Sequence, residues 1–439
     1  MIEKIKIKDL REHCTEESAW IAIRSKVYDI TSFVARHPGG KDQLRFGIGR
    51  DATTVFETYH NVENVQRVLN KLPIVGDLID SELPQFNEAS EFHKTINLKV
   101  RKRFHDAGLD MKNSHKAWLT YSVIFLSITL SFYQQYFGYM SNSTILQILC
   151  ASILGFFCAQ LGLHIMHDAS HFSITHNPLV WKYLGSTHDF VNGASFIAWI
   201  YQHTFGHHPY TNIPNADPDI HVQPERDFRR ILNYQKWFNY YKLQHIYAPI
   251  LYAGLGVKTR LQDLRILYIQ KSNGPISVNP LTIEQNILTI GGKIFFIFYR
   301  FLLPVLFGFT WTRVFALFLL SDIVTSYWLA LTFQANHVVE EVMLPFQQSK
   351  DVDWAKMQVM TTVDYAINSV LTQLAVGSLN FQTVHHLFPG VLQHHYPLIQ
   401  DIIYDECRKN NVKYNTKETL IEAVAAHIQF LKNMGEKEI

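Results

Sequence analysis

The sequence predicts a small α+β domain followed by an all-α membrane domain with four transmembrane helices and a histidine-rich helical cap. Three observations support this fold class. Residues 1–78 alternate short polar and apolar stretches that are separated by turn residues. Long uncharged apolar segments follow further along the chain, and several of the 22 histidines gather in short clusters beside them. A domain of strands and helices attached to a helical membrane domain accounts for all three.

The composition is that of a folded membrane protein. Of the 439 residues, 47% are hydrophobic and 18% are charged, against about 25% charged in soluble proteins. The four cysteines form no CxxC pair, which argues against a disulfide scaffold. A net charge of +2 gives no reason to expect a nucleic-acid partner. The first residues, MIEKIKIKDLREH, lack the apolar core of a secretory signal, so we expect no cleaved signal peptide.

The composition changes after the first domain. Residues 79–116 are predicted to form a linker and a membrane-proximal helix, because an acidic stretch is followed by the basic run Arg101–Arg103. Residues 117–439 form the predicted membrane domain. No Asp, Glu, Lys or Arg occurs from Ala117 to His167. A membrane span needs about 20 apolar residues, so this stretch holds two spans joined by a turn at 138–144.

Two more apolar segments lie near residue 300, with a turn expected at Thr312–Arg313. Arg313 is the only basic residue in the two predicted turns, whereas several Lys and Arg precede the first span. By the positive-inside rule, both termini and the histidine clusters are therefore expected on the cytosolic side. The four spans are predicted at about 118–138, 145–165, 294–311 and 314–336.

Two histidines in the first domain have the pattern of haem ligands. His37 stands in the segment VYDITSFVARHPGG, and His60 ends the segment GRDATTVFETYH. Two histidines at separate helix ends can bind one haem iron from opposite faces, which leaves no open position and suits electron transfer. Glycines next to His37 permit a tight turn and close backbone approach. The alternative is a pair of ordinary surface histidines.

This region resembles cytochrome b5 over about residues 5–78. The resemblance implies a bound haem b whose axial ligands are His37 and His60.

The remaining histidine clusters have the spacing of metal ligands. They read HIMHDASH (164–171), HTFGHH (203–208), NH (336–337) and QTVHH (382–386). Residues four apart share one face of an α-helix, so His167 and His171 should point together, as should His203 and His207. His208 should then point to a different side. Gln382 lies one helical turn before His385 and His386.

These clusters favour two metal ions. Seven cluster histidines and His337 are too many for a single tetrahedral zinc, which takes four ligands. Imidazole ligands suit iron, zinc or copper, so ligand type alone does not choose the metal. His164 shares the face of His167 and could be a ligand or a packing residue. Asp168 is expected to orient a histidine, and isolated histidines such as His188 are expected to be structural.

The motifs HDASH, HTFGHH and QTVHHLFP resemble those of membrane fatty acyl desaturases. A cytochrome b5 domain at the N-terminus and a Gln that opens the third motif resemble the front-end subfamily. NADPD at 215–219 and FQANHVVE at 333–340 extend the similarity. Many members have QIEHH where this chain has QTVHH, so Val384 replaces an acidic residue. The resemblance implies a diiron centre held by His167, His171, His203, His207, His208, His337, Gln382, His385 and His386.

The resemblance further implies an O2-dependent oxidoreductase of the endoplasmic reticulum membrane. Its haem domain would receive electrons from an NADH-dependent cytochrome b5 reductase. The new cis double bond would lie between an existing one and the carboxyl end of a polyunsaturated chain carried by CoA or phospholipid. The first two motifs favour Δ5 over Δ6. The alternatives are a sphingolipid Δ8-desaturase or lipid hydroxylase, and a non-enzymatic membrane protein for haem electron transfer or metal handling.

Overall fold

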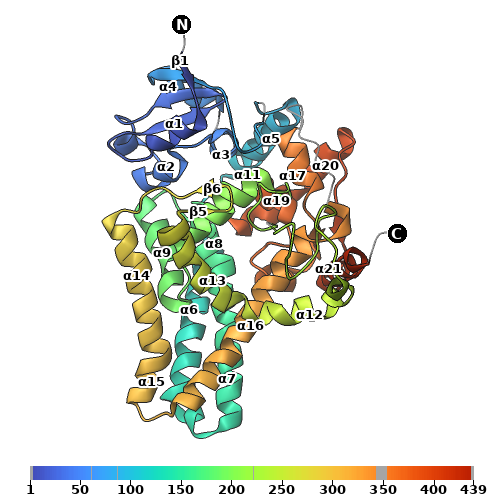
Figure 1. Ribbon diagram of the computed structural model, residues 1–439. Helices are drawn as coiled ribbons and strands as arrows, with labels where there is room; N and C mark the ends of the chain where they lie inside the picture. Colours follow the sequence, from blue (N-terminus) through green and yellow to red (C-terminus); the bar gives the residue numbers. More distant parts are fainter. Residues whose placement is uncertain (1–2, 61, 87, 221, 343–352, 437–439) are drawn as a thin grey trace.

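The computed structural model describes residues 3–60, 62–86, 88–220, 222–342 and 353–436. The N-terminal domain lies at one end of the molecule, above the ends of the long helices (Figure 1). The long helices α6, α7, α14 and α16 run away from it, and the C-terminal helices lie beside their upper halves. The histidine-bearing segments α8, α11 and α19 lie between these parts.

The N-terminal domain is built on a four-stranded sheet of order β1-β4-β3-β2. β1 pairs with β4 in parallel, and the other neighbours are antiparallel. Val27 and Leu10 are fully buried in its core. The predicted α+β fold is confirmed. The elements are β1 (Glu3–Ile5), α1 (Ile7–Glu12), β2 (Trp20–Ile23), β3 (Lys26–Asp29), η1 (Val34–Arg36), α2 (Lys41–Gly47), α3 (Thr53–Tyr59), α4 (Val62–Leu69) and β4 (Ile74–Leu78).

The predicted membrane-proximal helix is α5 (Glu91–Ala107). Ser90 caps its first turn by accepting a hydrogen bond from the His93 amide, and Gly108 ends it in the left-handed conformation. Its basic side chains contact the C-terminal helix α20 (Tyr396–Lys409), where Arg103 pairs with Asp401 at 3.0 Å. The helix is therefore tied to the far end of the chain.

Three helical stretches within the described residues are long and apolar enough to cross a membrane: Thr144–Ser170, Ile283–Leu306 and Trp311–His337. The prediction of four spans is therefore not confirmed. Residues 118–138 do form a helix, α6 (His115–Tyr136), which packs along α7 (Thr144–Gln160). Its polar side chains make it less apolar than the other three; they include Thr120, Ser122, Ser127, Thr129, Ser131, Gln134 and Gln135.

The turn between the last two long helices lies earlier than predicted. α16 (Trp311–His337) already contains Thr312 and Arg313. Thr310 caps its N-terminus by accepting a hydrogen bond from the Arg313 amide, and Gly308 takes a φ of 95°, which favours glycine. The first turn, η2 (Tyr139–Asn142), is where the sequence placed it. Both turns lie at the end of the helices farthest from the N-terminal domain (Figure 1).

The charges inside the long helices are buried against protein. Arg300 is 5% exposed and Asp322 is 2% exposed. The Asp322 carboxylate pairs with the guanidinium of Arg260, on α13 (Leu255–Leu264). Paired, buried charges are those that an apolar environment tolerates.

The remaining elements follow in chain order. They are η3 (Leu161–Met166), α8 (His167–Ser170), α9 (Pro178–Val191), α10 (Phe196–Trp199), η4 (Ile200–His207), α11 (His208–Tyr210), η5 (Asn239–Leu243), α12 (Gln244–Leu251), η6 (Tyr252–Gly254), η7 (Arg265–Gln270), β5 (Ser272–Asn273), β6 (Ile276–Ser277), α14 (Ile283–Ile297), η8 (Phe298–Leu302), α15 (Leu303–Leu306), η9 (Glu340–Val342), α17 (Trp354–Met360), β7 (Asp364–Tyr365), α18 (Val370–Ala375), α19 (Gln382–Leu387), η10 (Gln393–His395), β8 (Thr416–Lys417) and α21 (Leu420–Gly435).

The contact between α7 and α16 predicts a packing defect. A Cβ on Gly155 would lie 2.3 Å from the carbonyl oxygen of Ser321. Gly155→Val should force the helices apart and cost about 1–3 kcal/mol of stability, seen as a lower Tm of the purified protein in detergent. Gly291→Val is the matched control, because a Cβ there meets nothing within 4 Å. Equal Tm values for the two variants would contradict this account.

Candidate metal centre

Eight histidines from four separate segments converge at one buried centre. Their side-chain nitrogens form overlapping groups whose atoms lie within 4.8 Å of one another. None is more than 6% exposed. One group combines the first, second and third motifs, and another includes the histidine at the end of α16. The groups are His167, His171, His203 and His385; His207, His337 and His386; and His208, His385 and His386.

The Nε2 atoms of these rings point toward one another. His208 Nε2 lies 3.2 Å from His203 Nε2 and 3.0 Å from His385 Nε2. His207 Nε2 lies 3.3 Å from His337 Nε2. Metal–imidazole bonds are about 2 Å long, so neighbouring ligand atoms on one ion are about 3.0–3.4 Å apart. The spacing therefore fits nitrogens that share a metal ion.

Several rings are held from outside through Nδ1. The Nδ1 of His207 lies 2.9 Å from Asp217, and that of His386 lies 2.8 Å from Gln358. His385 and His171 have the same contact with tyrosine hydroxyls, from Tyr396 at 3.1 Å and Tyr59 at 2.9 Å. A proton on Nδ1 that is donated outward leaves Nε2 free to bind metal.

The Nε2 atom of His171 tests whether the centre fits a metal ion. It is buried and has no hydrogen-bond partner among the described residues. Its ring centroid lies 4.5 Å from that of His208 and 4.8 Å from that of His385. A buried nitrogen without a partner is costly in an apolar interior, and a metal ion would satisfy it. These histidine nitrogens therefore fit the two metal ions that the histidine clusters predicted.

The spacing predicted that His208 points away from the other histidines of its motif. The structure instead directs its ring toward them. Residues 200–207 form a π-helix, η4, with i→i+5 hydrogen bonding. The wider turn brings residues five apart onto one face, so His203 and His208 meet with ring centroids 4.6 Å apart. His207 stays close as well, with its centroid 5.5 Å from that of His203. The second motif thus directs all three rings to the centre.

The expected role of Asp168 belongs instead to Asp217. The contacts described for Asp168 are with the hydroxyl of Tyr121 at 2.6 Å and the amide of Gln393 at 2.8 Å, and none is with a histidine. Asp217 is fully buried and accepts from His207. Burial alone would lower the pKa of His207, but the carboxylates of Asp217 and Asp219 raise it above its ordinary value. Asp217 lies in the NADPD motif, ten residues after His207.

Gln382 lies at the centre with its amide nitrogen facing the histidines. Asn336 donates both to the carbonyl of Leu379 at 2.8 Å and to the amide oxygen of Gln382 at 2.7 Å. The Gln382 nitrogen is therefore turned to His337 Nε2, at 2.7 Å, and His386 Nε2, at 3.2 Å. Because the oxygen is already engaged, this orientation favours a hydrogen-bonding role over direct metal ligation.

His164 lies outside the metal-binding groups. Its Nε2 is 2.9 Å from the carbonyl oxygen of Leu374, and its Nδ1 is 3.3 Å from the amide of Gln393. Both ring nitrogens are thus engaged away from the centre, which favours the packing role. His188 is bonded to Asn192 at 3.1 Å.

His37 and His60 face each other in the N-terminal domain. Their ring centroids are 6.0 Å apart, which leaves room for one iron with two bonds of about 2 Å. His37 Nδ1 contacts the carbonyl of Gly40 at 3.2 Å, and His60 Nδ1 contacts that of Phe56 at 2.9 Å, so Nε2 remains for the metal. Burial lowers the pKa of His60 to about 4, and the neutral ring is the form that binds iron. The pair fits axial ligation of haem.

A cavity of about 480 Å³ adjoins the metal centre. His207 and His337 line one part of it, beside the apolar side chains of Trp199 and Phe333. Elsewhere its wall includes the polar side chain of Lys258. An apolar chamber that reaches metal ligands can hold an extended apolar molecule next to them.

The chain matches two family models. Residues 143–418 match that of fatty acid desaturases, and residues 6–79 match that of cytochrome b5-like heme/steroid binding domains. An acyl-lipid (8-3)-desaturase from Mortierella alpina is 49% identical, over 98% of this chain and 96% of its own length. The Delta(5) fatty acid desaturase A of Dictyostelium discoideum is 37% identical, over 97% of this chain and 93% of its own. An sn-1 linoleoyl-lipid 6-desaturase from Synechocystis sp. is 27% identical, over 82% and 99%.

The contact between Asp217 and His207 predicts weaker metal binding when its charge is removed. Asp217→Asn should lower iron affinity and turnover about 10–100-fold, because the ring loses the charged acceptor that orients it and makes it more basic. Metal titration of the purified protein measures the affinity. Asp110→Asn is the control, since Asp110 pairs with His176, which lies outside the metal-binding groups. The interpretation fails if the two variants lose affinity equally.

Alanine substitutions of His167 and His164 should differ sharply in activity and iron content, although the two residues lie three positions apart. His167→Ala removes a nitrogen from the centre and should abolish product formation and lower the non-haem iron content. His164→Ala leaves the centre complete and should keep measurable activity and bound iron. Elemental analysis of the folded variants is the measurement. Iron loss in His164→Ala, with a normal haem spectrum, would place His164 among the ligands.

Proposed function

This chain belongs to the fatty acid desaturase family and carries a fused cytochrome b5 domain, and on that premise we propose its reaction in detail. It is an acyl-lipid desaturase of the front-end type. We propose that it places a cis double bond between an existing one and the carboxyl end of a polyunsaturated chain, at Δ5 in preference to Δ6. The relatives named Delta(5) and (8-3)-desaturases support this preference.

The observation that carries the proposal is the buried histidine centre with an apolar cavity beside it. We propose that one iron is held by His167, His171 and His203, and a second by His207, His337 and His386. His208 and His385 lie between the two groups, since each has close contacts in more than one of them. Gln382 would hydrogen-bond a water bound to the metal. When bound, the two irons would activate O2 for removal of hydrogen from adjacent methylenes.

The side chains of this chain position the reactants. The cavity wall of Trp199 and Phe333 would hold the acyl chain and exclude water beside His207 and His337. Register along this cavity would decide which methylenes react. No side chain of the centre needs to act as a base, because the histidines hold metal. The acyl chain loses two hydrogens, and O2 leaves as two waters after it takes up two further electrons and two protons.

The two external electrons would come from NADH through a flavoprotein reductase, one at a time, by way of the haem held by His37 and His60. A haem with two histidine ligands has no open position, so it carries electrons and leaves O2 chemistry to the other centre. The desaturase family argues against the non-enzymatic alternative, a protein for electron transfer or metal handling alone.

We further propose residence in the endoplasmic reticulum membrane with the metal centre and both termini cytosolic. Support comes from the two hairpin turns, which lie together at the far end of the long helices (Figure 1). Outward-facing apolar side chains on these helices, such as Ile294 and Phe315, suit contact with lipid. CoA or phospholipid would carry the acyl chain, with Lys258 at the cavity wall available for an anionic headgroup.

Feeding polyunsaturated acids to yeast that express the protein tests this function. Gas chromatography should show a new Δ5 double bond, and the product should disappear in His37→Ala or His60→Ala. Each of these variants should lose the low-spin b-type spectrum but keep its non-haem iron. Free cytochrome b5 should rescue them poorly, because a tethered domain has an effective concentration of order mM. A product desaturated only at Δ6 would overturn the regiochemical assignment.

A further inference from the structure

Tyr59 joins the haem domain to the metal centre. It is the last residue of α3, directly before the haem ligand His60. Its hydroxyl lies 2.9 Å from Nδ1 of His171, which is 112 residues further along the chain. The Nε2 of the same ring faces the other metal-binding histidines. A single side chain thus spans the gap between a ligand of the haem and a ligand of the metal centre.

The surroundings of Tyr59 are shaped around its ring. A Cβ on Gly390 would lie 3.1 Å from the Tyr59 ring, so glycine there leaves the space the ring needs. On another side the ring meets Phe172 edge-on, with centroids 6.0 Å apart. A neutral hydroxyl can accept the Nδ1 proton of a metal-bound His171.

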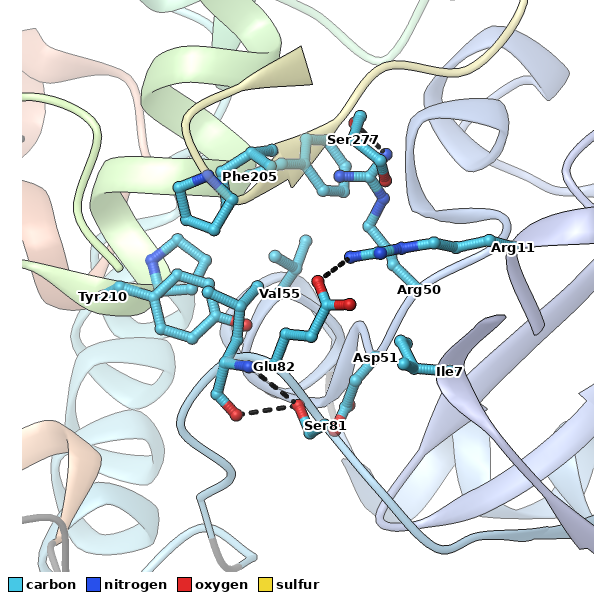
Figure 2. A pocket seen from close by; sticks show the side chains of 14 residues that line it. Ile7, Arg11, Arg50, Asp51, Val55, Ser81, Glu82, Phe205, Tyr210 and Ser277 are labelled. Carbon is cyan, nitrogen blue, oxygen red and sulfur yellow. Dashed lines mark hydrogen bonds and ion pairs between the residues drawn. The ribbon is translucent and has the colours of Figure 1, made fainter. Parts of the chain in front are cut away.

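The haem domain is held against the membrane domain by further contacts elsewhere in the interface. Arg50 donates to the carbonyl of Ser277 at 2.8 Å and lies over the rings of Tyr201 and Phe205, at 5.2 and 5.5 Å. Figure 2 shows Arg50, Phe205 and Ser277 around the small cavity at this junction. Asn279 adds hydrogen bonds to two carbonyls of the haem domain, at 2.8 and 3.0 Å. Tyr59 is therefore presented to His171 by a docked domain.

We propose that Tyr59 is the coupling residue between the two redox centres of this chain. The path runs from the His60 ring through one peptide link to Tyr59, across its hydroxyl to Nδ1 of His171, and through that ring to the metal. One electron passes along it each time ferrous haem becomes ferric, and two such transfers supply the two external electrons of each desaturation. The inference rests on the proposed function, because it assumes that the haem domain reduces the metal centre.

Tyr396 provides an internal comparison. Its hydroxyl makes the same kind of contact with a ligand, at 3.1 Å from Nδ1 of His385. It lies at the start of α20, in the membrane domain, and has no covalent link to a haem ligand. If an outer hydroxyl only orients the ring, the two tyrosines should behave alike. If Tyr59 conducts electrons as well, its loss should slow oxidation of the haem much more than the loss of the Tyr396 hydroxyl does.

Stopped-flow spectroscopy of the full-length, haem- and iron-loaded protein tests this. The haem is reduced without oxygen by NADH and a trace of reductase. The protein is then mixed with O2 and acyl substrate while the haem absorbance is followed. Tyr59→Phe should slow the iron-dependent phase of haem oxidation about tenfold or more, beyond any slowing seen in Tyr396→Phe. The haem potential and the iron content should stay at wild-type values.

The matched control is Tyr28→Phe, on β3 of the haem domain, which should keep the wild-type rate per bound iron. Tyr396→Phe measures the cost of losing an outer hydroxyl alone, and it should slow haem oxidation clearly less than Tyr59→Phe does. A wild-type rate in Tyr59→Phe overturns the proposal. So does equal slowing in Tyr59→Phe and Tyr396→Phe, or slowing that vanishes when rates are divided by iron content. If iron-depleted wild-type protein oxidises its haem as fast as loaded protein, the electron route of the proposed function fails together with this inference.

Discussion

The structure depends on the burial of eight imidazoles around one small volume. Each ring brings a polar nitrogen into an interior that offers no water, and such a group is costly unless it is bonded. Inward-facing Nε2 atoms 3.0–3.3 Å apart can be satisfied together by metal. Outer partners such as Asp217 and Gln358 hold the Nδ1 sides. The four segments that supply the rings must therefore meet at fixed distances, and the long helices provide the frame for this.

The π-helix η4 contributes side chains both to the metal centre and to the contact with the haem domain. One face carries His203, His207 and, just beyond its end, His208 to the metal centre. Tyr201 and Phe205 of the same helix contact Arg50 and Phe46 of the haem domain. The docking surface of the electron donor and the ligand set are thus parts of one rigid element. Movement of the haem domain and distortion of the metal centre are coupled through it.

The differences between expectation and structure have physical causes. Four-residue spacing misplaced His208 because it assumes α-helical winding, whereas η4 winds with i→i+5 bonds. Neighbourhood in sequence suggested Asp168 as the partner of a histidine, but its carboxylate is taken by Tyr121 and Gln393. The predicted position of the turn before α16 was wrong because Thr310 caps this helix, which places Arg313 in its first turn. Each depends on a backbone geometry or a long-range contact.

The sequence by itself determined the fold class and the chemistry of the site. Helical spacing, the HPGG turn and long apolar runs depend on local residue order, so His37, His60 and the eight clustered histidines could be named from it. Only the tertiary structure decided which side chains contact one another. It paired Asp217 with His207, turned the Gln382 amide nitrogen inward and set Tyr59 against His171. Such contacts join residues up to 112 positions apart, and no local pattern encodes them, because they arise only when separate segments pack together.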